Sequence, residues 1–297
     1  MYMWTETIEI PGPYNFDFGL NRLAMDPLHK VSLEERSIKL PIYLREKEVA
    51  IIQAIGTTET PKFVISGQNV DTRAIVLKEV FRIFQWDKQL HLIHEHFTHT
   101  NLKEVFMDHR GTPIVLDFAL HANLFKAIIH QQIHMSLAIS ITADFVHTYG
   151  EEVDGVPFYP NPEVIAQLTI EDLTALRLTK RRAEYIIGLS KQLANGEIEL
   201  SHLVELEDED VVKYLTKIRG IGPWTAQNFL LFALGRNNVF PATDIGIQRA
   251  AQNILQLEQK PSLEEMQIFS ETWKPYLSFA TLYLWRSIEV QREKRGE

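Results

Sequence analysis

Two glycines and a proline within four residues constrain the fold of this 297-residue chain more than any other feature. They stand in the segment Arg219-Gly220-Ile221-Gly222-Pro223. Gly220 and Gly222 favour a tight turn with positive φ, because neither has a Cβ atom. Pro223 suits the first position of a helix, where its missing N–H costs no hydrogen bond. The segment predicts a hairpin between two helices.

The flanking sequence sets the ends of those helices. An acidic first turn at residues 207–210 is typical of a helix N-terminus. We expect helices over Asp208–Ile218 and Pro223–Leu234, the second closed by Gly235. The backbone N–H groups of the hairpin would then converge at a helix N-terminus without side chains, an arrangement that suits a phosphate oxygen. A plain turn between helices is the alternative interpretation.

Asp244 is the second informative residue. It follows Pro241 in Val239-Phe240-Pro241-Ala242-Thr243-Asp244-Ile245-Gly246 and stands at the predicted start of a helix, where aspartate is a common cap. A helix N-terminus also stabilises an ionised carboxylate. Such a carboxylate beside a sugar could stabilise the positive charge that develops as a glycosidic bond breaks. A purely structural cap is the alternative.

The rest of the chain indicates an α+β fold, with a small mixed α/β N-terminal domain at residues 1–110 and a mainly helical region at 111–297. Four short β-rich runs occupy Thr5–Ile10, Ser37–Leu40, Val49–Ile55 and Lys62–Ser66, and a helix is expected over Thr72–Trp86. A helical stretch runs over Leu124–Tyr149 to Gly150. Further helices are expected at Pro162–Gln167, Ile170–Ala175, Arg181–Ala194, Asp244–Leu255 and Leu263–Ile288, the last broken at Pro275. We expect two helical subdomains with a cleft between them.

The amino-acid composition limits the kinds of site and partner that the chain can have. The chain has no cysteine, which excludes disulfides, thiolate zinc sites and iron–sulfur clusters. No apolar run is long enough for a membrane span, and the start at residues 1–6 lacks the features of a secretion signal, so we expect a cytoplasmic protein without a membrane partner. The net charge of −9 argues against broad nucleic-acid affinity but leaves room for a local basic patch.

Two polar clusters have alternative interpretations. The histidine-rich segment His91–His99 could suggest zinc, but its spacing fits no zinc pattern and a solvated helix end is favoured. The basic run Thr179–Arg182 is either a helix surface or a contact to a nucleic-acid backbone.

Residues 204–250 resemble the helix-hairpin-helix and Gly/Pro-Asp motif of base-excision DNA glycosylases, and the chain is most similar to the AlkA class, 3-methyladenine-DNA glycosylase II. The similarity extends to residues 14–18, 128–133 and 273–285. Two positions depart from the AlkA-like pattern: Gln132 replaces an apolar residue, and Leu277 replaces an arginine.

The resemblance implies a role for particular residues. It makes Asp244 the catalytic carboxylate and Gln132 the wedge that fills the gap left by a flipped base. It assigns the DNA phosphate to Gly220, Gly222 and Thr225, and the base pocket to Trp224, Trp285 and Trp273. Trp224 stands where relatives with lyase activity have a lysine, so we expect hydrolysis without strand nicking. The family's hairpin also holds a monovalent cation, here at the backbone carbonyls of Thr216, Ile218 and Ile221.

The expected function is that of a monofunctional DNA glycosylase for 3-methyladenine and 7-methylguanine in base-excision repair. It would act as a monomer on double-stranded DNA containing damaged bases, near the nucleoid, with no required cofactor beyond a structural Na⁺ or K⁺. The alternatives are a glycosylase for deaminated or oxidised purines, and a non-catalytic helix-hairpin-helix DNA-binding protein.

Overall fold

A computed structural model describes residues 4–295, with side chains up to Glu289. Residues 1–3, which belong to the segment expected to lack a secretion signal, lie outside the described part. It begins with an antiparallel sheet in the order β1-β5-β4-β3-β2. Its strands are β1 (Trp4–Glu9), β2 (Lys30–Ser32), β3 (Ser37–Ile42), β4 (Glu48–Ala54) and β5 (Lys62–Gly67). The four predicted β-rich runs are confirmed, whereas the short β2 was not predicted.

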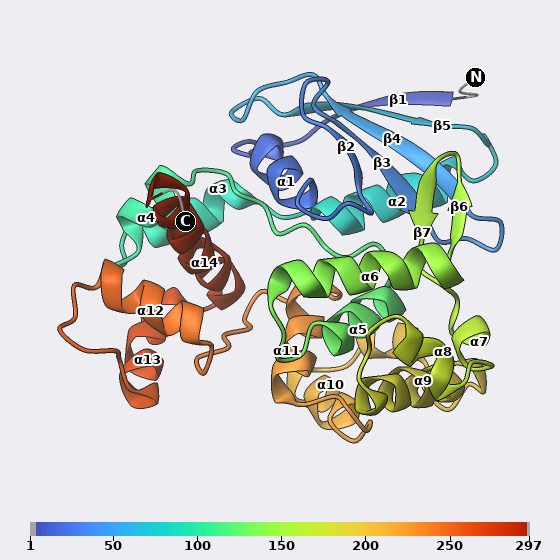
Figure 1. The fold of residues 1–297 in the computed structure, drawn as a ribbon. Helices are drawn as coiled ribbons and strands as arrows, with labels where there is room; N and C mark the ends of the chain where they lie inside the picture. Colours follow the sequence, from blue (N-terminus) through green and yellow to red (C-terminus); the bar gives the residue numbers. More distant parts are fainter. Residues whose placement is uncertain (1–3, 296–297) are drawn as a thin grey trace.

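Two helices cover one face of this sheet, α1 (Phe16–Leu23) and α2 (Arg73–Phe84) (Figure 1). Alternate residues of β5 are buried, as expected of a strand with one covered face, and Val49 of β4 belongs to a separate buried cluster with Val156 and Phe158. Phe63 of β5 stacks on Trp86 at 4.3 Å between ring centroids and meets Phe16 of α1 edge-on at 5.1 Å. The aromatic side chains therefore fix the position of α1 on the sheet.

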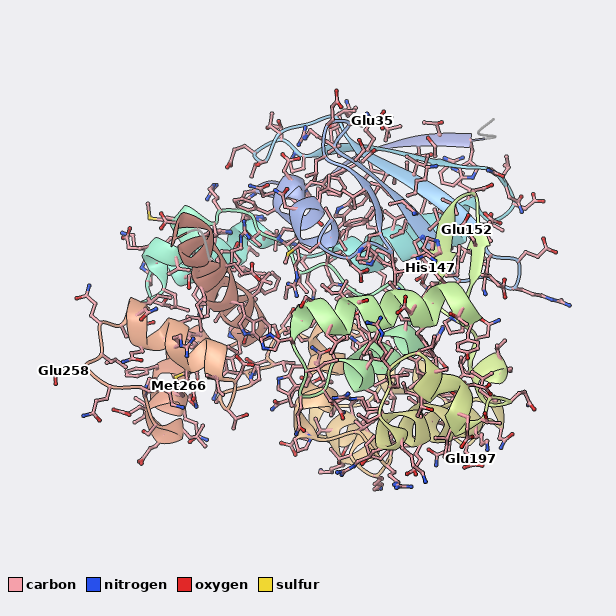
Figure 2. All side chains as sticks on the ribbon, viewed as in Figure 1. Glu35, His147, Glu152, Glu197, Glu258 and Met266 are labelled. Atoms are coloured by element: carbon pink, nitrogen blue, oxygen red, sulfur yellow. The ribbon has the colours of Figure 1, made fainter. Side chains whose placement is uncertain are left out.

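The helical region forms two groups (Figure 1). One group, here the α5–α11 lobe, holds α5 (Leu120–Ile129), α6 (Met135–Tyr149), α7 (Pro162–Ile165), α8 (Ile170–Ala175), α9 (Lys180–Ala194), α10 (Asp208–Leu215) and α11 (Pro223–Phe232). The other, the C-terminal lobe, holds α3 (Leu90–Phe97), α4 (Lys103–Asp108), α12 (Ile245–Ile254), α13 (Leu263–Ser270) and α14 (Leu277–Arg295). Figure 2 shows Glu258 at the outer edge of this lobe and the buried Met266 inside it.

The expected helical stretch over residues 124–149 is wrong in one respect, because the structure divides it into α5 and α6. The break lies at residues 130–134, where Gln132 has a φ of 51°. A left-handed residue cannot continue a right-handed helix, and apolar spacing on both sides conceals the break. A hairpin of β6 (Glu151–Val153) and β7 (Val156–Phe158) follows Gly150 and was also missed.

The C-terminal lobe includes helices from the N-terminal third of the sequence. Phe97 of α3, Phe106 of α4 and Tyr283 of α14 form a ring stack with centroid separations of 3.7 and 3.8 Å. His94 joins it, since its Nε2 accepts the Gly111 N–H at 2.9 Å and lies 2.9 Å from the Tyr283 hydroxyl. The division at residue 110 stays a prediction, but α3 and α4 pack on α14.

Helix ends differ slightly from expectation. The predicted break at Pro275 is confirmed, with α13 and a 3₁₀ turn before it and α14 after it. The helix expected over 208–218 ends at Leu215, because residues 216–218 close into the turn. Among the described helices, none is both long and apolar enough to cross a membrane.

Acidification should weaken the fold through its buried histidines. Burial lowers the pKa of His94 to about 4, below its ordinary value of 6.5. Protonation of its Nε2 atom would break the hydrogen bond from the Gly111 N–H, because both groups would then be donors. The pKa values of His121 and His130 are also lowered by burial to about 4. Between pH 6.5 and 4 the unfolded chain then binds more protons, so the free energy of unfolding falls as pH falls.

His94→Gln keeps an acceptor for Gly111 and removes one titrating group. Its urea midpoints, measured from pH 7.5 to 4.5, should fall less steeply than those of the wild type. His147→Gln, at an exposed position of α6, serves as the control and should keep the wild-type slope. An unchanged slope in His94→Gln would show that His94 is not the group responsible.

Candidate functional site

The hairpin between α10 and α11 depends on Gly220. Its φ is +98°, and a Cβ atom there would lie 2.4 Å from the Tyr185 ring. Backbone conformation and packing therefore both require glycine. The expected positive φ at Gly222 is wrong: Gly222 is extended, with φ −97° and ψ 176°, and caps α11. A Cβ on Gly222 would meet no atom within 4 Å, so this position faces open space.

A groove of about 780 Å³ lies over the hairpin. Three segments line it: the hairpin with the first turn of α11, the loop between α5 and α6, and the first turn of α9. The groove brings together several residues that the sequence indicated as candidates for binding DNA: Gln132, Thr179, Arg181, Arg182, Gly220, Gly222, Trp224 and Thr225. The basic run at 179–182 thus lies beside the hairpin, on the side where a backbone phosphate would bind.

Gln131 ties the α5–α6 loop to the hairpin. Its side-chain Nε2 donates to the Gly220 carbonyl at 2.8 Å, and its own carbonyl accepts a hydrogen bond from Arg182. The exposed Gln132 is the next residue, so its position depends on the hairpin. Sequence reasoning missed Gln131, although a second amide beside Gln132 was the available signal.

Positive charge gathers around Tyr185 despite the acidic composition. The guanidinium groups of Arg181 and Arg219 each lie 5.5 Å from the centre of its ring. Arg219 also pairs with Glu184 at 2.8 Å. The net charge of −9 therefore does not describe this surface.

Asp244 caps α12 through one carboxylate oxygen. Its Oδ1 accepts the Ile247 N–H at 2.9 Å and the indole N–H of Trp285 at 3.1 Å. Within residues 4–295, Oδ2 accepts no hydrogen bond. One oxygen is thus held in place by two donors, while the other is available to a ligand.

One face of α14 fixes the chain that leads to Asp244. Ser278 accepts the Val239 N–H at 3.0 Å, and Thr281 donates to the Val239 carbonyl at 3.3 Å. Trp285 follows one turn later on the same face, since residues four apart lie above one another on a helix. The indole that holds Asp244 and the hydroxyls that fix the preceding loop therefore come from one helix.

The three expected pocket tryptophans have different environments. Trp224 is 43% exposed and lines the groove. Trp285 is half-buried and stacks on Phe232, the last residue of α11, at 6.0 Å between ring centroids. Helix α11 thus runs from the groove to the neighbourhood of Asp244, about 13 Å along its axis. Trp273 is fully buried against Phe240, so it packs in the core and its ring is not accessible to a base; its expected role in the base pocket is therefore wrong.

Metal sites receive little support from the side chains. Among the described residues, no three His, Asp or Glu side chains are grouped to hold a metal ion. In the histidine segment, His94 packs on Tyr283, and the Nε2 atom of His96 lies 3.0 Å from the Thr272 carbonyl. The monovalent cation at Thr216, Ile218 and Ile221 stays a prediction.

The structure is an α+β fold with a glycine hairpin between α10 and α11, two helices of its helical half. Residues 125–275, about half of the chain, match the model of the HhH-GPD superfamily base excision DNA repair proteins. The chain belongs to this superfamily, and its resemblance to AlkA-like glycosylases is confirmed.

Two relatives and one solved structure illustrate the similarity. The chain is 46% identical to the Bacillus subtilis (strain 168) protein YfjP, provisionally assigned as a DNA-3-methyladenine glycosylase, over 97% of this chain and 100% of that protein. It is 36% identical to a DNA-3-methyladenine glycosylase of the same organism, over 55% of this chain and 57% of that protein. The structure of 3-methyladenine DNA-glycosylase from Archaeoglobus fulgidus superimposes with a TM-score of 0.82 and 26% identity, covering 95% of this chain and 97% of that one.

Gly222→Asp should separate DNA binding from folding. Aspartate is a favoured helix cap and tolerates the extended backbone of Gly222, so the free energy of unfolding should change by less than about 0.5 kcal/mol. Its carboxylate would project into the groove and repel a phosphate. We expect at least a tenfold loss of affinity for duplex DNA by fluorescence anisotropy. The neutral cap Gly222→Asn is the control and should lose less; equal losses would contradict a phosphate site.

Gly220→Ala should instead damage the fold. Positive φ strains alanine by about 1–3 kcal/mol, and the clash with Tyr185 adds to this cost. We expect a lower urea midpoint together with weaker DNA binding. Gly188→Ala is the matched control, because a Cβ at this helical position of α9 meets no atom within 4 Å. That control should be as stable as the wild type or more so.

Proposed function

We propose that this protein is a monofunctional DNA glycosylase that hydrolyses the N-glycosidic bond of alkylated purines such as 3-methyladenine and 7-methylguanine. The observation that carries the proposal is the Asp244 carboxylate, held through Oδ1 by two N–H donors and open at Oδ2. Membership of the superfamily and the names of its relatives support the reaction class.

In the proposed reaction, Asp244 faces the sugar of a flipped nucleotide. As the bond between the base and C1′ breaks, positive charge develops on the sugar, and the ionised carboxylate stabilises it. Water then adds to C1′, giving an abasic site and the free base. A base alkylated at a ring nitrogen carries positive charge and leaves readily, so the chain needs no strong acid at the base.

The groove supplies the binding part of the proposal. Backbone N–H groups at the start of α11 would hold a phosphate. The Thr225 hydroxyl, also expected to do so, is buried at 2% exposure beside the Gln131 amide, so it is a weaker candidate. Gln132, exposed at the tip of the α5–α6 loop, would enter the duplex where the base has left, while Gln131 fixes the loop to the hairpin. Trp224 and Trp285 would contact the extruded base.

Asp244→Asn should abolish base release and preserve DNA binding. Asparagine is also a good helix cap, so α12 should keep its N-terminus. We expect single-turnover release from DNA treated with a methylating agent to fall at least a thousandfold, with an unchanged dissociation constant for abasic DNA. Near-normal rates in this variant would reject Asp244 as the catalytic carboxylate.

A panel of lesions separates the competing functions. Release of 3-methyladenine or 7-methylguanine by the wild type supports the proposal. Release confined to hypoxanthine or oxidised purines would favour the second kind of glycosylase. Damage-dependent binding without release of any base would favour a non-catalytic DNA-binding protein.

Strand nicking should be absent. The residue two positions after Gly222 is Trp224, whose indole cannot form a Schiff base with the sugar. Incubation with abasic DNA and borohydride should therefore trap no covalent complex, and alkali should be needed to cleave the product strand. A complex that persists in Trp224→Phe but is lost in a Lys217→Gln variant would instead reveal a different amine.

A further inference from the structure

Arg22 extends the site into the N-terminal domain. It lies in the last turn of α1, and its guanidinium carbon stands 4.6 Å from the centre of the Phe232 ring. The same ring stacks on Trp285, which donates to Asp244. Arg22 and Asp244 therefore each contact one member of the same pair of stacked aromatic side chains, although they lie far apart in the sequence.

The Arg22 side chain is exposed to solvent, yet protein atoms surround it closely enough that desolvation lowers its pKa; Glu289 and Asp117 act to raise that pKa, and Arg286 acts to lower it. Among the side chains that the structure describes, up to Glu289, none forms a hydrogen bond or an ion pair with this guanidinium. A guanidinium has five N–H donors in a planar fork, so Arg22 offers a positively charged donor surface beside the Phe232 ring.

This placement complements one edge of a purine. With the sugar at Asp244 and the base lying along Trp285 and Phe232, the atoms that project farthest from the sugar are those at position 6. Arg22 would meet a 6-carbonyl oxygen as an acceptor, but a 6-amino group as a second donor. A base with a 6-amino group, such as 3-methyladenine, would be opposed by hydrogen bonding, because the amino group and the guanidinium are both donors.

We propose that Arg22 is a specificity-determining residue that selects damaged purines with a 6-carbonyl oxygen, such as hypoxanthine and 7-methylguanine, over 3-methyladenine. This inference rests on the proposed glycosylase function and changes its expected substrate preference, from 3-methyladenine toward purines with a 6-carbonyl oxygen. It also assigns a role in the site to the N-terminal domain, through the end of α1.

The test compares wild type with Arg22→Met, which keeps an unbranched apolar stem over Phe232. Single-turnover rate constants are measured on duplexes containing hypoxanthine, 7-methylguanine or 3-methyladenine. We expect Arg22→Met to lose about ten- to a hundredfold on the two 6-carbonyl purines, as for loss of a charge-assisted hydrogen bond, and to keep or gain activity on 3-methyladenine. Arg22→Lys should recover part of the loss, because it restores charge without the fork.

Several outcomes would overturn the inference. An equal loss on all three lesions, with a smaller salt dependence of binding, would show that Arg22 contacts a phosphate. Unchanged rates on all three lesions would show that Arg22 contacts neither the base nor a phosphate. Arg45→Met, at an exposed position of the same domain, and the urea midpoint of each variant control for stability. If the wild type releases none of the bases, the proposed function itself fails; if its rates are normal and the lesion ratios stay fixed in Arg22→Met, only the role of Arg22 fails.

Discussion

The contact between the Gly220 backbone and the Tyr185 ring holds the groove together. The hairpin packs so closely on α9 that a side chain at Gly220 would clash with the Tyr185 ring. Arg181 and Arg219 gather around the same ring, and Gln131 binds the Gly220 carbonyl. A single close packing contact thus sets the positions of the backbone donors, the basic side chains and the Gln132 loop. Each of these would be displaced if Gly220 moved.

Asp244 belongs to a separate structural unit. Its loop is fixed by Ser278 and Thr281 of α14, and its carboxylate by Trp285 of the same helix. Helix α14 in turn packs through Tyr283 on Phe106 of α4. The carboxylate therefore depends on the C-terminal lobe, whereas the hairpin depends on the α5–α11 lobe. Phe232 at the end of α11, stacked on Trp285, is one contact between the two.

Local chemistry explains which features the sequence reveals. Glycine, proline and helix caps act within a few residues, so the hairpin, the start of α12 and the break before α14 could be predicted. The role of Trp273 could not, because burial depends on what the rest of the chain packs against it. The extended backbone of Gly222 and the left-handed Gln132 also escaped prediction, since either residue type tolerates several conformations. Arg22 and Gln131 act on partners more than 80 residues away, beyond any spacing pattern.

The separation of hairpin and carboxylate between lobes has a mechanical consequence. Residues 233–244 carry the chain from the end of α11 to the cap of α12, so the backbone joins the two lobes here by one loop. Residues 109–119 join the lobes a second time, between α4 and α5, and a DNA strand held by the hairpin and presented to Asp244 would add a further connection. The bound DNA would then hold the two lobes together, so the protein should be more rigid with DNA than without it.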